Sequence, residues 1–115
     1  MELSNFSIQD IVDQALEAAH EAALQILNRQ GDCGACGFAW VNIWEYQGKK
    51  IRANSTIGKA LTAAGIRKDY TGGFCLWNPA KLPVQSVDIL DQGAAAAAAV
   101  FKSHGFTAYA GSRLD

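Results

Sequence analysis

Hydrophobic residues recur every three or four positions through the first thirty residues of the chain, with polar residues between them. The apolar members of this series are Ile8, Ile11, Val12, Ala15, Leu16, Ala19, Ala22, Ala23, Ile26 and Leu27. This spacing places them on one stripe of a helix, because an α-helix turns once in about 3.6 residues. The pattern predicts a long amphipathic helix over residues 1–30.

Both ends of this helix carry recognisable signals. Ser7 suits the N-cap position, since its hydroxyl can accept a hydrogen bond from the amide of Asp10, whose carboxylate can reach back. Phe6 and Ile11 then occupy the two positions of a hydrophobic staple. Gly31 suits the left-handed residue that ends a helix. The signals therefore predict a regular helix between Ser7 and Gly31.

After a glycine-rich hinge, residues 38–46 show the two-residue period of a strand. One face, made of Ala39, Val41 and Ile43, is compact and suits packing under a helix. The other face consists of Phe38, Trp40, Asn42, Trp44 and Tyr46. Aromatic residues favour strands, so this face suits a second buried layer or a subunit interface, or alternatively a platform that stacks a planar base. Both interpretations predict that something covers it.

The rest of the chain alternates short helices with short strands. The predicted elements are a basic strand at 49–53 after a Gln47-Gly48 turn, a helix from Ser55 to Gly65, a strand at 73–77, a helix within 87–104, a strand at 106–110 and a tail at 111–115. The order α-β(β)-α-β-α-β predicts a two-layer α+β fold, with a long N-terminal helix and two further helices on a sheet of three or four strands. The strands are too few for a Rossmann domain, and no G-x-G-x-x-G follows a strand.

Length and composition fit one domain over residues 1–115, consisting of the helix at 1–30 and an α/β core at 36–115. Half of the residues are hydrophobic and only 18% are charged, which excludes a disordered chain. Six consecutive alanines, Ala94 to Ala99, lie inside the third predicted helix. Alanine is the best helix former and has no bulk, so this run predicts close packing against the sheet or a second subunit.

The net charge of −1 conceals an uneven distribution. Residues 1–30 carry five acidic groups and one basic group, whereas residues 31–70 carry three acidic and six basic groups. The overall balance argues against bulk binding of nucleic acid or of an acidic membrane as the main activity. A small anion would be attracted to the middle third of the chain, although these lysines and arginines equally suit an ordinary solvated surface.

Three cysteines and the lack of a signal-like or membrane-spanning apolar segment favour a reducing, cytoplasmic location. Cys33 and Cys36 form a C-x-x-C pair, but a zinc site needs four ligands, and only Cys75 and His104 remain as candidates. A redox pair would follow a strand and open a helix, whereas this pair follows a helix. We therefore expect structural or incidental cysteines, with no metal and no cofactor.

No catalytic arrangement of serine, histidine and aspartate, or of cysteine and histidine, stands out, which favours a binding protein over an enzyme. Arg113 could bind phosphate or carboxylate bidentately, or could pair with an acidic group in a frayed tail. Gln85 and Ser86 could cap the helix that follows them or could contact an anion at its N-terminus.

Four segments resemble a group of small proteins encoded by tailed bacteriophages. They are Cys36-Gly-Phe-Ala-Trp-Val41, Arg67-Lys-Asp-Tyr-x-Gly-Gly73, Gln85-Ser86 and His104-Gly-x-x-Ala-Tyr-Ala-Gly-Ser-Arg-Leu-Asp115. In size and in α/β order, the chain is more loosely similar to the Thoeris anti-defense sponge proteins. The resemblance implies an oligomer in the cytoplasm of an infected bacterium. It also implies a nucleotide-derived anionic ligand, held between subunits and not degraded.

Nine residues are the candidates for such a ligand site, since aromatic rings stack a base and basic groups bind phosphates. They are Trp40, Arg52, Lys68, Phe74, Trp77, Gln85, Ser86, Tyr109 and Arg113. The ligand expected is a cyclic ADP-ribose-like signal or a cyclic oligonucleotide. The main alternative is a host-takeover factor that binds a bacterial protein through the aromatic strand face. An enzyme that uses Cys36 or Cys75 is a third possibility.

Overall fold

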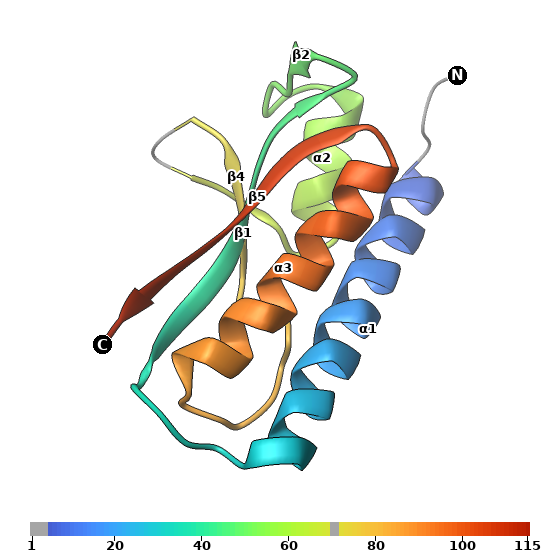
Figure 1. The fold of residues 1–115 in the computed structure, drawn as a ribbon. Helices are drawn as coiled ribbons and strands as arrows, with labels where there is room; N and C mark the ends of the chain where they lie inside the picture. The colour runs from blue at the N-terminus through green and yellow to red at the C-terminus, as the bar shows by residue number, and fades with distance from the viewer. Residues whose placement is uncertain (1–4, 70–71) are drawn as a thin grey trace.

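The computed structural model describes residues 5–69 and 72–115. Its elements are α1 (Asn5–Gln30), β1 (Gly37–Tyr46), β2 (Lys49–Lys50), α2 (Thr56–Ala63), β3 (Arg67–Lys68), β4 (Phe74–Trp77), α3 (Val87–Ser103) and β5 (Phe106–Leu114). The predicted α+β class, with a long N-terminal helix on a small sheet, is confirmed (Figure 1). The sheet has five strands, more than the three or four predicted.

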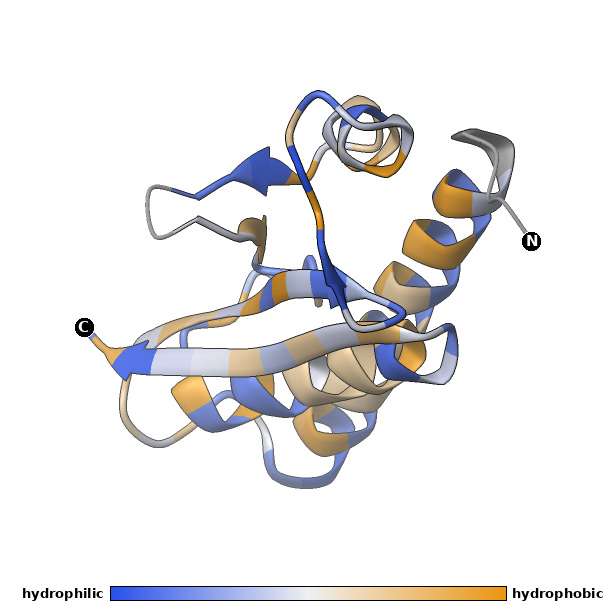
Figure 2. Cartoon of the chain, turned by 90° about the horizontal axis from the view of Figure 1, so that it is seen from above, coloured by the Kyte–Doolittle hydropathy of each residue, from blue (hydrophilic) through white to orange (hydrophobic). Residues whose placement is uncertain are grey.

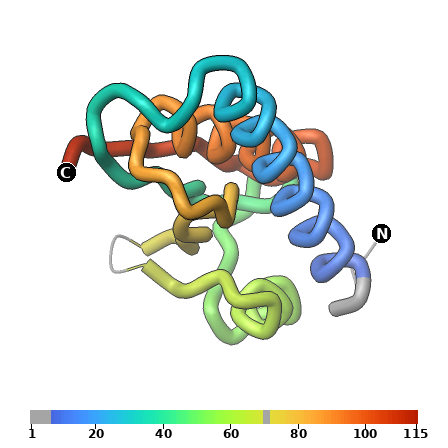
Figure 3. Tube along the Cα trace, turned by 90° about the horizontal axis from the view of Figure 1, so that it is seen from below, coloured from blue at the N-terminus to red at the C-terminus, as the bar shows by residue number. Residues whose placement is uncertain are grey.

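Strand β1 is the centre of an antiparallel sheet. It pairs with β5 along one edge and with β4 and β2 along the other, and β3 extends the sheet beyond β4. The three helices lie in an arc on one side of the sheet, which Figure 3 shows from below. The inner-face residues Ala39, Val41 and Ile43 are fully buried beneath the helices, as the alternating pattern predicted.

Small residues let α1 and α3 approach each other closely. Ala15, Ala19 and Ala23 of α1 are fully buried. A β-carbon on Gly93 of α3 would lie 2.8 Å from the β-carbon of Ala80 and 3.1 Å from the carbonyl oxygen of Ala19. Each turn of α1 carries hydrophobic residues on one side and hydrophilic residues on another, as Figure 2 shows, so only its inner stripe joins the core.

The alanine run has buried and exposed members. Ala94, Ala97 and Ala98 are buried, whereas Ala95 and Ala99 are exposed. The helix therefore uses its small residues on one side for packing within the chain. No helix in the described parts of the chain is long and apolar enough to cross a membrane.

Several element boundaries differ from those predicted. Helix α1 already includes Asn5, so Ser7 lies inside the helix and is not its N-cap. The side chain of Phe6, the first member of the predicted staple, lies outside the described residues. Strand β2 is shorter than residues 49–53. Strand β3, two exposed basic residues, has no apolar period that would reveal it.

The predicted tail is the second half of β5. Gly111, Ser112, Arg113 and Leu114 continue the ladder with β1 as far as Gly37. This half of the strand is mostly exposed, so its sequence lacks the buried apolar alternation on which the prediction depended. The backbone pairing, and not a hydrophobic face, holds it in place.

A β-bulge corrects the predicted aromatic face at its far end. Ile43 pairs with Ala108 and Glu45 pairs with Thr107, so Trp44 is an extra residue opposite β5. The bulge turns Tyr46 to the inner face, where its ring lies 4.7 Å from that of Phe106. Strict alternation placed Tyr46 with the outer aromatic residues, which is wrong.

We predict that Ala97→Leu lowers the free energy of unfolding by about 1–3 kcal/mol, because Ala97 is fully buried and added methylenes overpack a close interface. Urea denaturation followed by circular dichroism measures the loss.

Ala99→Leu is the matched control, since this alanine is exposed on the same helix and leucine is also a good helix former. Its unfolding free energy should stay within about 0.5 kcal/mol of the parent value. Equal losses in both variants would contradict the assigned packing.

Candidate functional site

Aromatic side chains gather on the outer face of the sheet, opposite the helices. The ring of Trp40 is parallel to that of Trp77, with centroids 5.7 Å apart and 3° between the planes. The ring of Phe38 lies 5.6 Å from Trp77 on the same face. Trp77 is 49% exposed and Tyr109 is 56% exposed. The described residues thus place no second layer over this face, and its burial in a subunit interface or under a stacked base stays a prediction.

The position of Trp40 depends on Gly111 of β5. The two residues are directly opposite each other in the ladder, and a β-carbon on Gly111 would lie 2.6 Å from the indole nitrogen of Trp40. The indole can therefore lie against the backbone of β5 on one side while it stacks beside Trp77 on the other. This packing fixes the orientation of the aromatic pair.

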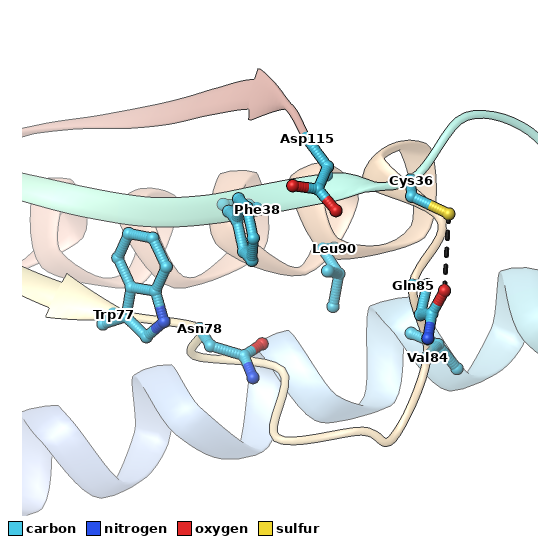
Figure 4. Close-up of a pocket in the computed structure, with 10 residues that line it drawn as sticks. Cys36, Phe38, Trp77, Asn78, Val84, Gln85, Leu90 and Asp115 are labelled. Carbon is cyan, nitrogen blue, oxygen red and sulfur yellow. Dashed lines mark hydrogen bonds between the residues drawn. The ribbon is translucent and has the colours of Figure 1, made fainter.

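A pocket of about 320 Å³ lies at one end of this aromatic face. It forms where β1 begins, β4 and β5 end, and α3 starts. Its lining residues are Cys36, Gly37, Phe38, Ala39, Trp77, Asn78, Val84, Gln85, Leu90 and Asp115 (Figure 4). Sites for small molecules are commonly concave and combine apolar or aromatic side chains with a few polar groups. This pocket has aromatic and aliphatic side chains in its lining, but slightly more of its exposed surface is polar than apolar.

The side chains that line the pocket carry both hydrogen-bond acceptors and donors. The thiol of Cys36 donates a hydrogen bond to Oε1 of Gln85 at 3.4 Å. Oδ1 of Asn78 is buried and has no hydrogen-bond partner in the part of the chain that the structure describes. Asn78 also has a φ of 48°, in the left-handed region that asparagine tolerates better than most residues. The carboxylate of Asp115 lies at the top of the pocket in Figure 4, beside Phe38 and Leu90.

Arg113 places a positive charge next to the pocket. The guanidinium of Arg113 lies over the ring of Phe38, 5.5 Å from its centroid. The two residues are paired across the ladder between β1 and β5. Arg113 is exposed on a strand and is not part of a frayed tail, so the fold holds a positive charge beside the aromatic residues.

The N-terminus of α3 is already bonded from within the chain. The carboxylate of Asp32 accepts hydrogen bonds from the backbone amides of Gln85, at 3.2 Å, and Ser86, at 2.9 Å. Ser86 is the N-cap of α3, and its buried hydroxyl accepts from the amide of Ile89. These amides therefore hold Asp32 in place of the anion considered from the sequence. Of the two residues, Gln85 lines the pocket and Ser86 does not.

The other predicted ligand residues lie elsewhere. Phe74 is fully buried in the core. Arg52 is exposed in the loop before α2. Nζ of Lys68 donates to the carbonyl oxygen of Gly72 at 2.6 Å and lies 4.9 Å from the centre of the Phe74 ring. Tyr109 is on the outer face, opposite Asn42, with Nζ of Lys102 5.5 Å from its ring. The nine candidates therefore do not form one site.

Four of the nine do come together. Trp77 and Gln85 line the pocket, Trp40 stacks on Trp77, and Arg113 lies over Phe38. The sequence interpretation missed Asn78 and Asp115, which line the same pocket. In the sequence, Asn78-Pro79 indicated only the end of a strand. The backbone amide of Asp115 donates a hydrogen bond to the carbonyl oxygen of Cys36, and no residue near Asp115 in the sequence indicates this contact.

The cysteines are all free. Burial raises the pKa of the Cys75 thiol above its usual value, and the negative charge of Asp69 adds to the effect. Within residues 5–69 and 72–115, no cluster of three or more histidine, cysteine, aspartate or glutamate side chains could hold a metal ion.

No family model matches the chain, and no curated protein or solved structure matches it either. The chemistry of the pocket and of the aromatic face is therefore the basis for the function proposed below.

We predict that Asp32→Ala lowers the free energy of unfolding by about 0.5–2 kcal/mol, the usual range for loss of a helix cap. The reason is that the amides of Gln85 and Ser86 lose their acceptor. Thermal unfolding followed by circular dichroism measures the change.

Asp10→Asn, at an exposed position on α1, is the control and should leave the midpoint nearly unchanged. An Asp32 variant as stable as the parent would show that the carboxylate does not anchor the hinge to α3.

We predict that iodoacetamide modifies exposed Cys33 and Cys36 about tenfold or more faster than Cys75 at pH 7.5, because the thiolate is the reactive form. The raised pKa of Cys75 means that its rate should keep increasing as the pH rises through and above 9. Mass spectrometry of peptides gives the three rates.

In denaturing urea the three cysteines should react at similar rates, which serves as the control. If Cys75 in the folded protein reacts as fast as the exposed pair, its thiol is not shielded.

Proposed function

We propose that this protein binds a nucleotide-derived anionic ligand on its open sheet face and holds it without degrading it. The observation that carries the proposal is the cluster of Phe38, Trp40 and Trp77, which lies at the mouth of a pocket with the guanidinium of Arg113 beside it. A base needs an aromatic surface and a phosphate needs a cation, and both are present within one small region.

Trp77 is the main stacking surface in this proposal. Its ring is half exposed, yet it is held parallel to Trp40, which rests against Gly111. A ring that is already ordered costs the ligand little conformational entropy on binding. Stacking of one base on such a side chain is worth about 1–3 kcal/mol, enough to give an aromatic ligand measurable affinity when a charge contact adds to it.

Arg113 supplies the charge contact. It is on β5, two residues before Asp115, which directly follows the strand. The phosphate end of a ligand is therefore favoured near Arg113 and repelled near Asp115. The ligand would therefore bind in one orientation, with its heterocycle toward the pocket and its phosphates toward the exposed end of the Arg113 side chain.

The local chemistry supports binding without catalysis. The pocket lining contains no histidine. Nδ1 of His20 lies 2.9 Å from the carbonyl oxygen of Ala80, and Nε2 of His104 lies 3.0 Å from Oε1 of Gln14. The thiol of Cys36 donates to Gln85, and the pKa of Cys75 is raised, so neither cysteine has the activated environment of a catalytic nucleophile.

The biological role that we propose rests on the sequence resemblance to tailed-phage proteins. A non-degrading binder of a nucleotide signal would act as a sponge in the cytoplasm of an infected bacterium. It would lower the concentration of a cyclic ADP-ribose-like or cyclic oligonucleotide immune signal. A homo-oligomer would increase the number of sites per particle and could cover the aromatic face that the single chain leaves open.

A second candidate role is a host-takeover factor that binds a bacterial protein. The observation in its favour is β5, a nine-residue strand that pairs only with β1 within the described residues and so offers a free edge beside exposed Tyr109. This role requires a stoichiometric partner in a pulldown from host lysate that is lost with Tyr109→Ala. If the pulldown recovers no such partner, this second role is ruled out and only the ligand proposal remains.

For the ligand proposal, purified protein is titrated calorimetrically with cyclic ADP-ribose isomers and cyclic dinucleotides. We predict that Trp77→Ala weakens binding by roughly 5- to 150-fold, the equivalent of one lost stacking contact. We also predict that Arg113→Ala weakens it by roughly tenfold or more through loss of a charge-assisted contact.

Arg29→Ala, which removes an exposed arginine from the last turn of α1, is the matched control and should bind like the parent. Ligand released by heating should be chemically intact. Absence of binding across the whole panel, or recovery of cleaved product, would overturn the proposal.

A further inference from the structure

The hydrogen-bonding character of the pocket points to one particular edge of a ligand. An ionised carboxylate has two acceptor oxygens and no donor, so Asp115 can only accept. Asn78 also lines the pocket, and its Oδ1 is a second acceptor that is buried and has no partner among the described residues. The thiol of Cys36 already donates to Gln85. The edge of a ligand that faces Asp115 must therefore present hydrogen-bond donors, while the amide nitrogens of Asn78 and Gln85 and the indole nitrogen of Trp77 can donate to other parts of the ligand.

The unpartnered oxygen of Asn78 strengthens this point. A buried acceptor without a donor is costly in a folded protein, and such groups are rare. Asn78 lies between Trp77, which carries the stacking surface, and buried Pro79, and it is held in a left-handed backbone conformation. Figure 4 shows its side chain beneath the space that Phe38, Leu90 and Asp115 border from above. The atom has less than 1 Å² of accessible surface, so a ligand donor reaches it only when the Asn78 side chain turns toward the pocket.

We propose that the pocket recognises the donor edge of a guanine base. Guanine carries an N1–H and an exocyclic N2–H₂ side by side, and two parallel donors match the two oxygens of a carboxylate such as Asp115. Adenine has one amino group beside an acceptor ring nitrogen. The lone pair of that nitrogen would face a carboxylate oxygen, and two acceptors repel each other. Cytosine has the same alternation, and uracil has one donor between two carbonyl oxygens. Guanine alone among the common bases offers adjacent donors.

Size agrees with this assignment. A pocket of about 320 Å³ is near the lower limit for small-molecule sites, so it suits one heterocycle and not a whole dinucleotide. The inference rests on the proposed function and narrows it. The sequestered signal would be a cyclic oligonucleotide that contains guanine and not a cyclic ADP-ribose type. The guanine enters the pocket, while the rest of the ligand remains on the open face near Arg113.

The test compares GMP, IMP and AMP by calorimetric titration, because the three share their phosphate and differ at the base edge. IMP lacks only the exocyclic amine of GMP. We expect GMP to bind at least tenfold more tightly than IMP or AMP, since a carboxylate that loses one of two donors is left partly unpaired. In Asp115→Asn the preference for GMP over IMP should fall to within about threefold.

Asp10→Asn, which neutralises an exposed carboxylate on α1, should retain the full preference for GMP. Circular dichroism and a melting curve establish that Asp115→Asn is folded. Asn78→Ala provides a second readout, because removal of the acceptor should weaken GMP severalfold and leave the sheet pairing of Trp77 intact.

The outcomes separate the two proposals. Equal binding of GMP, IMP and AMP, unchanged in Asp115→Asn, would overturn guanine recognition while the nucleotide-binding function stands. A preference for AMP would overturn it in the same way and would favour an adenine-based signal. Failure of all three mononucleotides, of cyclic di-GMP and of cyclic ADP-ribose to bind would overturn both.

Discussion

The antiparallel pairing of β5 along the whole of β1 is the constraint on which the remaining structure depends. The ladder joins Gly37 to Leu114 at one end and Tyr46 to Phe106 at the other, across most of the molecule. It places Gly111 beneath Trp40, Arg113 beside Phe38 and Asp115 next to Cys36. Every polar or charged group that β5 contributes to the candidate site is therefore positioned by one backbone ladder, and a shift of one residue would turn these side chains to the other face.

The helices make the functional face possible by covering only the opposite one. Small residues at the seam between α1 and α3, among them Ala19 and Gly93, bring the two helices close enough to bury the inner side of β1 with little bulk. All three helices lie on that side (Figure 3). The outer face keeps its aromatic residues accessible without loss of the core, and Asp32 fixes the start of α3 at the pocket. Stability and recognition thus use different faces of the same sheet.

Local patterns predicted much of the fold because the periods of helices and strands can be recognised from residues that are close together in the sequence. Ser55 and Ser86 were recognisable as helix caps, and Ala39, Val41 and Ile43 as a buried strand face. The candidate site was predicted only in part. Trp40, Trp77, Gln85 and Arg113 do lie together, but Phe74 is buried in the core, and Arg52 and Lys68 lie outside the pocket lining. Residue type alone identified groups that can bind a nucleotide, without showing which of them share a surface.

The sequence by itself determined the class of the fold, the order of its three helices and of the strands other than β3, and the division of β1 into an apolar face and an aromatic face. Each of these follows from spacing within a short segment. Only the tertiary structure decided that Trp44 forms a bulge and turns Tyr46 inward, that Asp32 occupies the amides before α3, and that Asn78 and Asp115 border one pocket. These facts depend on contacts between segments that are between about 40 and 80 residues apart in the chain, and such contacts are fixed by strand register and helix packing, which no local period encodes.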